Sequence, residues 1–198
     1  MTNAVWKRSQ NALDYGSQLL ENADVKLRET TAEDLETLAA WWNDPAYAPL
    51  QQIVTKPRPA GGLVEMFQEW SLNRPNSGNA GFSVVSAEDG ELCGHVTLYG
   101  AALPARAAEF AIMIAPKFTG RGLGSAATAL MLRYAFEELG LNRVGLKVWG
   151  YNDRAIRAYE RAGFKKEGAR RQAVFHAGRF HDEVLMSVLA EDYFDNDS

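Results

Sequence analysis

The chain has 198 residues, of which 46% are hydrophobic and 23% charged, which predicts one globular domain with a full core. Its net charge of −4 argues against nucleic-acid binding, because phosphate neutralisation needs a clustered excess of Lys and Arg. A single cysteine, Cys93, excludes an internal disulfide. No apolar stretch reaches the roughly 20 residues that span a bilayer, and the first residues lack the apolar segment of a signal peptide. We therefore expect a cytoplasmic protein without membrane or nucleic-acid partners.

The first 24 residues are expected to form a helical arm ahead of the main domain, residues 25–198. Apolar residues that recur seven apart would make one stripe on a helix: Trp6, Leu13 and Leu20, with Val5, Ala12 and Leu19 beside them. Gly16 disfavours the helix. Such a stripe would pack on the arm's own domain or on a second subunit, as in a homodimer.

The next segment predicts a strand, two helices and two loops. The strand covers 25–28, and Thr31 with Asp34 three residues later forms the start signal of a helix that stops at 43–45. Residues 46–62 contain three prolines and predict a loop. A second helix is expected over 63–72, and residues 74–79 have loop composition.

The rest of the chain predicts a mixed sheet. Strands are expected over 81–85, 92–99 and 107–115, then a helix over 122–139 with Gly140 after its end. A strand over 144–148, a helix from Asn152 to Gly163, and strands over 164–167 and 183–189 complete the order. The fold class is α/β, with a mixed, mostly antiparallel central sheet flanked by helices.

A glycine-rich turn between a strand and a long helix is the clearest chemical signal. It runs from Thr119 to Ser125, with glycines at 120, 122 and 124. Alternate glycines allow a tight turn that exposes successive N–H groups, and the helix N-terminus adds partial positive charge. Together these features predict a phosphate cradle.

Two other glycine-rich turns that bind phosphate can be told apart from this one by the spacing of their residues. A P-loop needs Gly-Lys-Ser/Thr, which is missing here. A dinucleotide-binding turn needs its third glycine one position later and an acidic residue at the end of the next strand, where Trp149-Gly150 stands. A glycine-rich connection without a ligand stays open on this motif alone.

Two motifs in order resemble the GNAT superfamily, the Gcn5-related N-acetyltransferases. Thr119–Gly124 matches the pattern Gln/Arg-x-x-Gly-x-Gly/Ala, with Thr119 in place of the usual Gln or Arg. Asn152–Phe164 is similar to Asn-x-x-Ala/Ser-x-x-x-Tyr-x-x-x-Gly-Phe. The resemblance covers about 25–189, and the ribosomal-protein alanine and spermidine/spermine acetyltransferases are the nearest subgroups.

The resemblance implies a sheet whose fourth and fifth strands splay apart to admit acetyl-CoA. Backbone groups of Ile112, Met113 and Ile114 should bond the pantetheine arm. Asn152 should contact the amide chain of the cofactor. The pyrophosphate should bind the turn formed by Thr119, Gly120, Arg121, Gly122, Leu123, Gly124 and Ser125.

The resemblance also implies a role for Tyr159 as the general acid that protonates the departing thiolate. Asn152 and Tyr159 lie two helical turns apart, about 10 Å along one helix face, so both can meet an extended cofactor. The plain alternative is an amphipathic tyrosine with a buried ring and a solvated hydroxyl.

The amine acceptor must lose a proton before it attacks, because a lysine-like amine titrates near pKa ~10.4 and is mostly ammonium at neutral pH. Glu109, near the start of the strand that leads into Ile112–Ile114, is the candidate base. Alternatively it is a strand carboxylate that pairs with Arg106 or faces water. His176 and His181 are expected in a hairpin turn, and no metal site is expected.

The acceptor itself is open: a small-molecule amine or a protein N-terminal amine. Polyamine acetyltransferases carry an acidic cluster after the first helix, and residues 42–52 hold one acid, Asp44. The alternatives are a non-catalytic acyl-CoA-binding sensor or scaffold, and an acyltransferase for a longer acyl donor.

Overall fold

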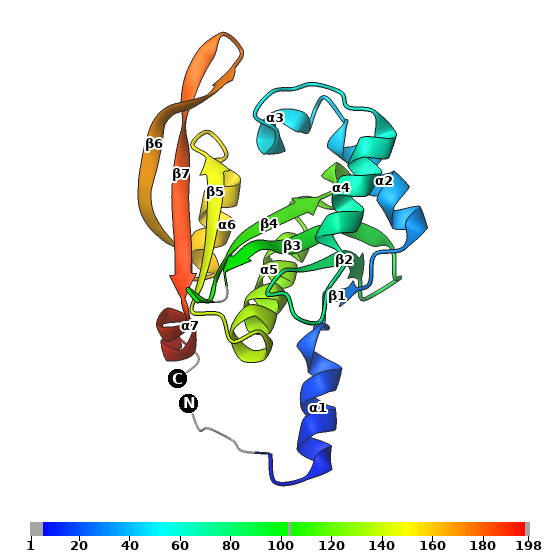
Figure 1. The fold of residues 1–198 in the computed structure, drawn as a ribbon. Helices are drawn as coiled ribbons and strands as arrows, with labels where there is room; N and C mark the ends of the chain where they lie inside the picture. Colours follow the sequence, from blue (N-terminus) through cyan, green and yellow to red (C-terminus); the bar gives the residue numbers. More distant parts are fainter. Residues whose placement is uncertain (1–5, 103, 197–198) are drawn as a thin grey trace.

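The computed structural model describes residues 6–102 and 104–196, and it places helices on both faces of one seven-stranded sheet (Figure 1). The strands are β1 Val25–Arg28, β2 Ala80–Ser86, β3 Leu92–Ala102, β4 Ala107–Ile114, β5 Arg143–Trp149, β6 Lys165–His176 and β7 Arg179–Leu189. The helices are α1 Ser9–Leu19, α2 Ala32–Trp42, α3 Ala48–Gln51, α4 Ala60–Trp70, α5 Leu123–Arg133, α6 Asp153–Arg161 and α7 Ala190–Asn196. A 3₁₀ turn covers Pro116–Phe118, and a π-helical turn, Tyr134–Glu138, follows α5. The expected α/β class is confirmed.

The strand order is β1-β2-β3-β4-β5-β7-β6, and β4–β5 is the parallel pair among antiparallel ones. In the described part of the chain this pair joins only three residues of each strand, Ala107–Glu109 with Arg143–Gly145. Beyond them β4 continues to Ile114 and β5 to Trp149, and Figure 1 shows the two strands diverging. The expected splay of the fourth and fifth strands is therefore present.

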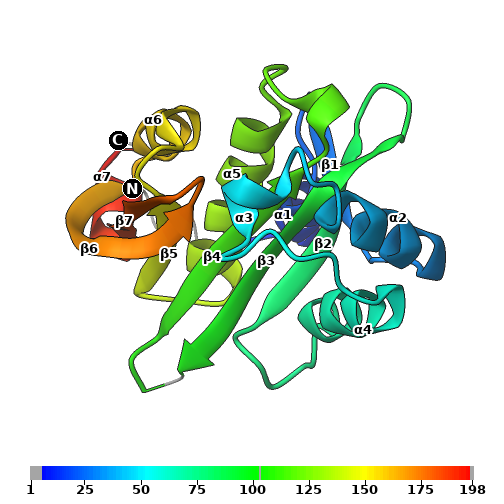
Figure 2. The ribbon, with the colours of Figure 1, turned by 90° about the horizontal axis from the view of Figure 1, so that it is seen from above.

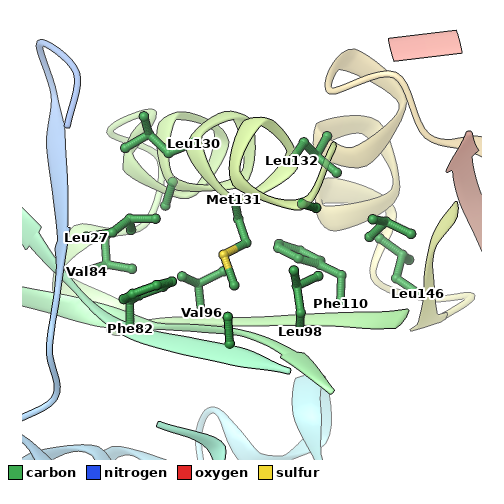
Figure 3. Packing of buried hydrophobic residues seen from close by; sticks show 14 of the residues in the cluster. Leu27, Phe82, Val84, Val96, Leu98, Phe110, Leu130, Met131, Leu132 and Leu146 are labelled. Atoms are coloured by element: carbon green, nitrogen blue, oxygen red, sulfur yellow. The ribbon is translucent and has the colours of Figure 1, made fainter. Parts of the chain in front are cut away.

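Two apolar layers hold the sheet between its helices. On one face Phe82, Val96 and Leu98 point at Met131 of α5, and all four side chains are buried (Figure 3). On the other face α2 and α4 enclose a smaller cluster of Leu38, Phe67 and Met113. Figure 2 shows α2 and α4 side by side on that face. Because apolar burial contributes about 25 cal/mol per Å², these layers fix the sheet against its helices.

The predicted cap of α2 is confirmed. Thr31 Oγ1 accepts from the Asp34 N–H at 3.3 Å, and the Asp34 carboxylate accepts from the Thr31 N–H at 2.9 Å. Burial opposes ionisation of Asp34, but the hydrogen bonds from Arg28, Thr31 and Ser83 together lower its pKa. The Asp34 carboxylate thus holds the N-terminal end of α2 against Arg28 of β1 and Ser83 of β2.

Three segments differ from the sequence prediction. The expected loop over 46–62 contains α3, whose first turn accommodates Pro49, and α4 begins at Ala60. The last strands are longer than expected, because β6 and β7 pair as a hairpin out to His176 and Arg179. The polar sequence of this segment gives no strand signal, because the tip of the hairpin is exposed to solvent. The sequence pattern does not indicate α7, which follows β7 directly.

Residues Ser9–Leu19 form helix α1, and its apolar stripe is only partly covered, with Ala12, Leu19 and Leu20 half-buried. None of the described residues of α1 is buried, and Trp6 and Leu13 are 55% and 65% exposed. The Trp6 ring lies 5.2 Å from that of Tyr15, while Leu20 packs against the main core. Val5 lies outside the described residues. Among those described, no helix has the length and apolar character needed to cross a membrane.

Candidate active site

A cavity of about 700 Å³ opens where β4 and β5 separate. Its walls come from β3, β4, β5 and β7, the start of α5 with the turn before it, one face of α6, and the α3 segment with α2 and α4. The divergence of two parallel strands therefore produces a cleft through the sheet that reaches both of its faces.

The edge of β4 at this cleft carries backbone groups that β5 does not pair. Ala111, Ile112, Met113 and Ile114 line the cavity, and each faces β3 on its other side. Unpaired N–H and C=O groups along a strand edge bind an extended chain as an added strand would. This edge fits the role expected for Ile112–Ile114.

The turn before α5 has the geometry of an anion cradle. Gly120 and Gly122 have φ of +80° and +85°, and a Cβ at either would meet no atom within 4 Å. The Ala126 N–H bonds the Gly122 carbonyl at 3.0 Å, so the amides just before Ala126 precede the ladder of α5. Open space, exposed amides and a helix N-terminus fit a pyrophosphate.

Most of the predicted site residues line this one cavity. They are Ile112, Met113, Ile114, Thr119, Gly120, Gly122, Gly124, Ser125, Asn152 and Tyr159. Arg121 is exposed instead, its guanidinium 5.5 Å from the Phe118 ring, and Leu123 is buried in the core. Asn152 Oδ1 caps α6 through the Ala155 N–H at 3.3 Å, as predicted.

Tyr159 faces the cavity from α6 with a desolvated hydroxyl. Its ring packs against Phe110 and Phe164, at 6.2 and 5.7 Å between centroids. Burial, with a smaller effect of Tyr47, raises the pKa of Tyr159 to about 12. The hydroxyl is therefore protonated throughout the neutral range, the state that a proton donor requires.

Glu109 lies beside the cavity and not among its lining residues. It stands opposite Tyr99 on β3 and Gly145 on β5, so it shares a sheet face with Tyr99, which does line the cavity. Its carboxylate lies over Gly145, where an added Cβ would come 2.9 Å from Oε1. Phe110 packs into the opposite layer, which is the condition for Glu109 to face the acceptor side.

Aromatic residues that the sequence reasoning missed form the wall on the acceptor side. They are Trp42, Tyr47, Phe67, Trp70 and Tyr99. His95 lies among them, 2% exposed, with Nε2 2.8 Å from Ser71 Oγ. Burial lowers the pKa of His95 to about 4, although Asp34 opposes this. The histidine is thus a neutral part of the wall.

The α3 segment closes this side of the cavity. The Tyr151 hydroxyl donates to the Pro49 carbonyl, and His176 Nε2 lies 3.1 Å from the Gln52 carbonyl oxygen. Gln52 in turn donates from Nε2 to the Trp42 carbonyl at 2.5 Å. The β6–β7 hairpin and the start of α6 therefore hold the segment in place.

Four charged side chains line the cavity. Lys147, Arg154 and Arg161 are basic, and Glu183 of β7 is the acid in the lining drawn from residues 6–102 and 104–196. Arg154 is within the Asn152–Phe164 motif, so the motif could have indicated it. Glu183, Tyr47 and the tryptophans come from segments without a motif, and only the fold brings them together.

The family profile described as Acetyltransferase (GNAT) domain matches residues 24–165. The putative ribosomal N-acetyltransferase YdaF of Bacillus subtilis is 38% identical over 105 residues, 53% of this chain and 57% of that protein. The spermidine N(1)-acetyltransferase of Escherichia coli (strain K12) is 34% identical over 105 residues, 53% and 56%. The matches therefore span just over half the length of these relatives.

Solved structures agree over almost the whole fold. The spermidine N-acetyltransferase of Vibrio cholerae, crystallised with CoA and spermine, is 27% identical with a TM-score of 0.76, covering 87% of this chain and 99% of that one. The profile match, the splayed β4–β5 pair and the glycine turn agree on one assignment. This chain belongs to the GNAT acetyltransferase family.

Proposed function

We propose that the protein transfers an acetyl group from acetyl-CoA directly to a primary amine. The observation that carries this proposal is one cavity that joins an unpaired β4 edge, a glycine cradle and the hydroxyl of Tyr159. The fold of a CoA-bound relative supports it. The expected cytoplasmic location stays a prediction.

In this proposal different residues of the chain bind acetyl-CoA and supply the proton for the leaving group. The β4 edge and the amides around Gly122 hold acetyl-CoA, so that its thioester reaches Tyr159. The amine nitrogen, having lost a proton, attacks the thioester carbonyl; a C–N bond forms and the C–S bond breaks. Tyr159 gives its proton to the leaving thiolate, the nitrogen loses a second proton as the amide forms, and Tyr159 then regains a proton from solvent. One proton is released overall.

The acceptor is proposed to be a small-molecule amine or a protein N-terminal amine. One relative is named a putative ribosomal N-acetyltransferase and another a spermidine N(1)-acetyltransferase, and these names support the two classes. A homodimer stays a proposal; a dodecameric spermidine N-acetyltransferase among the structural relatives supports self-association.

The test combines binding and turnover. Calorimetry should show acetyl-CoA binding, and assays of thiol release should show turnover with at least one member of a panel of amines, peptides and aminoglycosides. Binding without turnover would favour the sensor or scaffold alternative. Faster release from a longer acyl-CoA would favour the longer-acyl alternative.

A further inference from the structure

Glu183 brings a negative charge to the acceptor side of the cavity. It pairs with Trp149 across β5–β7, so its side chain shares a sheet face with Trp149 and Lys147, both of which also line the cavity. The Glu183 residue is 8% exposed. A primary amine bound here as ammonium would find no other carboxylate in the lining contributed by residues 6–102 and 104–196.

One oxygen of this carboxylate is engaged and the other is not. Arg170 of β6 donates from Nη1 to Glu183 Oε2 at 2.8 Å, and the Arg170 side chain is 58% exposed. Within the described residues Oε1 has no hydrogen-bond partner. Among the described residues Oε1 is not one of the fully buried atoms that lack a partner, so it is open to the cavity and can accept a charge-assisted hydrogen bond from an ammonium group.

The charges around Glu183 come from four strands. Arg170 on β6 and Lys147 on β5 are basic, while Tyr99 on β3 and Glu109 on β4 share the same face. Burial raises the pKa of Tyr99, and Glu109 and Glu183 raise it further. Glu109 and Glu183 therefore both affect the electrostatics around Tyr99, but of these two carboxylates only Glu183 lines the cavity.

We infer that Glu183 binds the ammonium group of the acceptor and takes its first proton. This inference rests on the proposed function. In the step, an N–H bond of the ammonium breaks and its proton passes to Glu183 Oε1, which leaves a lone pair on nitrogen for attack. Glu183 then releases that proton to solvent, while Tyr159 supplies the separate proton that the thiolate needs.

The experiment compares Glu183→Gln with the wild type, using spermidine and an alanine-initiated tripeptide amide as probes. We expect kcat/KM to fall about 10²-fold at pH 7, in the range of a lost general base, and to recover to within about tenfold near pH 9.5. The value of kcat/KM should recover because, at the higher pH, more of the amine is already deprotonated in solution and needs no base. Glu183→Asp keeps a carboxylate and should retain the wild-type shape of the pH profile.

A matched control removes a similar ion pair outside the cavity. Glu167 on β6 pairs with Arg143 at 2.8 Å and does not line the cavity. Glu167→Gln should keep the wild-type pH profile. In calorimetry, the affinity of both Gln variants for acetyl-CoA should stay within about threefold of wild type. The CoA complex of Glu183→Gln should bind the probe amines more weakly than wild type, and that of Glu167→Gln should not.

The outcomes separate the two proposals. Wild-type protein that binds acetyl-CoA but acetylates neither probe would count against the proposed function, and the probe titration would still decide the role of Glu183. Active wild type with a Glu183→Gln profile that superimposes on it, or that is lowered equally at every pH, would overturn the inference. A low-pH loss confined to Glu109→Gln would overturn it in favour of Glu109.

Discussion

Tyr159 is defined chemically by the surroundings of its hydroxyl. Phe110 and Phe164 enclose the ring, and burial raises the pKa of the phenol to about 12. No hydrogen bond from the described residues holds the hydroxyl proton. That proton is available to a partner inside the cavity, as the acid role requires.

Replacing Tyr159 by Phe should separate binding from chemistry. We expect kcat to fall by about 10²-fold or more, because the thiolate leaves without a proton donor. The affinity for acetyl-CoA should stay within a few-fold, since the ring is kept. Thiol release under single-turnover conditions measures the first, and calorimetry the second. Undiminished kcat, with chemistry shown to be rate-limiting, would remove Tyr159 from the mechanism.

His95 affects stability through its protonation. Its pKa is about 4 in the folded protein, against an ordinary value of 6.5. Below pH 6.5 the unfolded chain therefore binds a proton that the folded chain does not, and the contribution of His95 to stability is lost as pH falls from 6.5 to about 4. The full contribution is about 3 kcal/mol, at 1.36 kcal/mol per pKa unit.

His95→Gln should weaken this pH dependence. The amide can still bond Ser71 but does not titrate. Urea unfolding at pH 7 and pH 5 measures the change in free energy of unfolding for each protein. The wild type should lose about 2 kcal/mol more than the variant between these pH values. Equal losses would show that His95 is solvated in the folded state.

At the scale of elements, the N-terminus of α5 combines two functions of glycine. Gly122 has a φ of +85°, which a β-branched residue adopts only with strain, and its missing Cβ leaves open space in front of the amides. The strain and the open space can be tested apart, because Gly90 in the β2–β3 turn has a φ of +73° and equal space.

Gly122→Val and Gly90→Val should each lower the free energy of unfolding by roughly 1–3 kcal/mol, since both place Val in the left-handed region. Only Gly122→Val should also lose affinity for acetyl-CoA, by at least about tenfold, because its side chain would occupy the phosphate position. Calorimetry on the folded variants measures this. An unchanged affinity in Gly122→Val would refute the cradle.

At the scale of the whole molecule, the sheet consists of two halves joined by a short seam. β1–β4 form one half and β5–β7 the other, and in the described chain the three paired residues of β4 and β5 connect them. A ligand that bonds β4 along its open edge would brace the two halves.

Acetyl-CoA should therefore raise the melting temperature. At a ligand concentration of 100 Kd the stabilisation is about 2.7 kcal/mol, which corresponds to roughly 5–10 °C for a chain of this length. Differential scanning calorimetry at several concentrations checks the dependence. Gly90→Val should show the full shift and Gly122→Val a much smaller one at equal concentration. A shift of the same size in both variants would place the ligand elsewhere.

The sequence alone determined the local features. Thr31 and Asp34 form a cap because both partners lie within one helical turn, and the turn at Gly120–Gly124 forms because glycine accepts positive φ. The α/β order and the geometry of this turn follow from such short-range rules, while its role as a phosphate cradle stays a prediction. The acid role of Tyr159 came from the family resemblance, and it stays a prediction.

Tertiary structure decided what faces the cavity. Glu109 and Glu183 are both strand carboxylates, and nothing in their local sequence distinguishes the one that lines the cavity; the pairing of β5 with β7 does. Residues 46–62 suggested a loop by proline content, yet contacts with Tyr151 and His176, about a hundred residues away, hold α3 over the acceptor side. Long-range packing sets these contacts, and sequence periodicity carries no information about them.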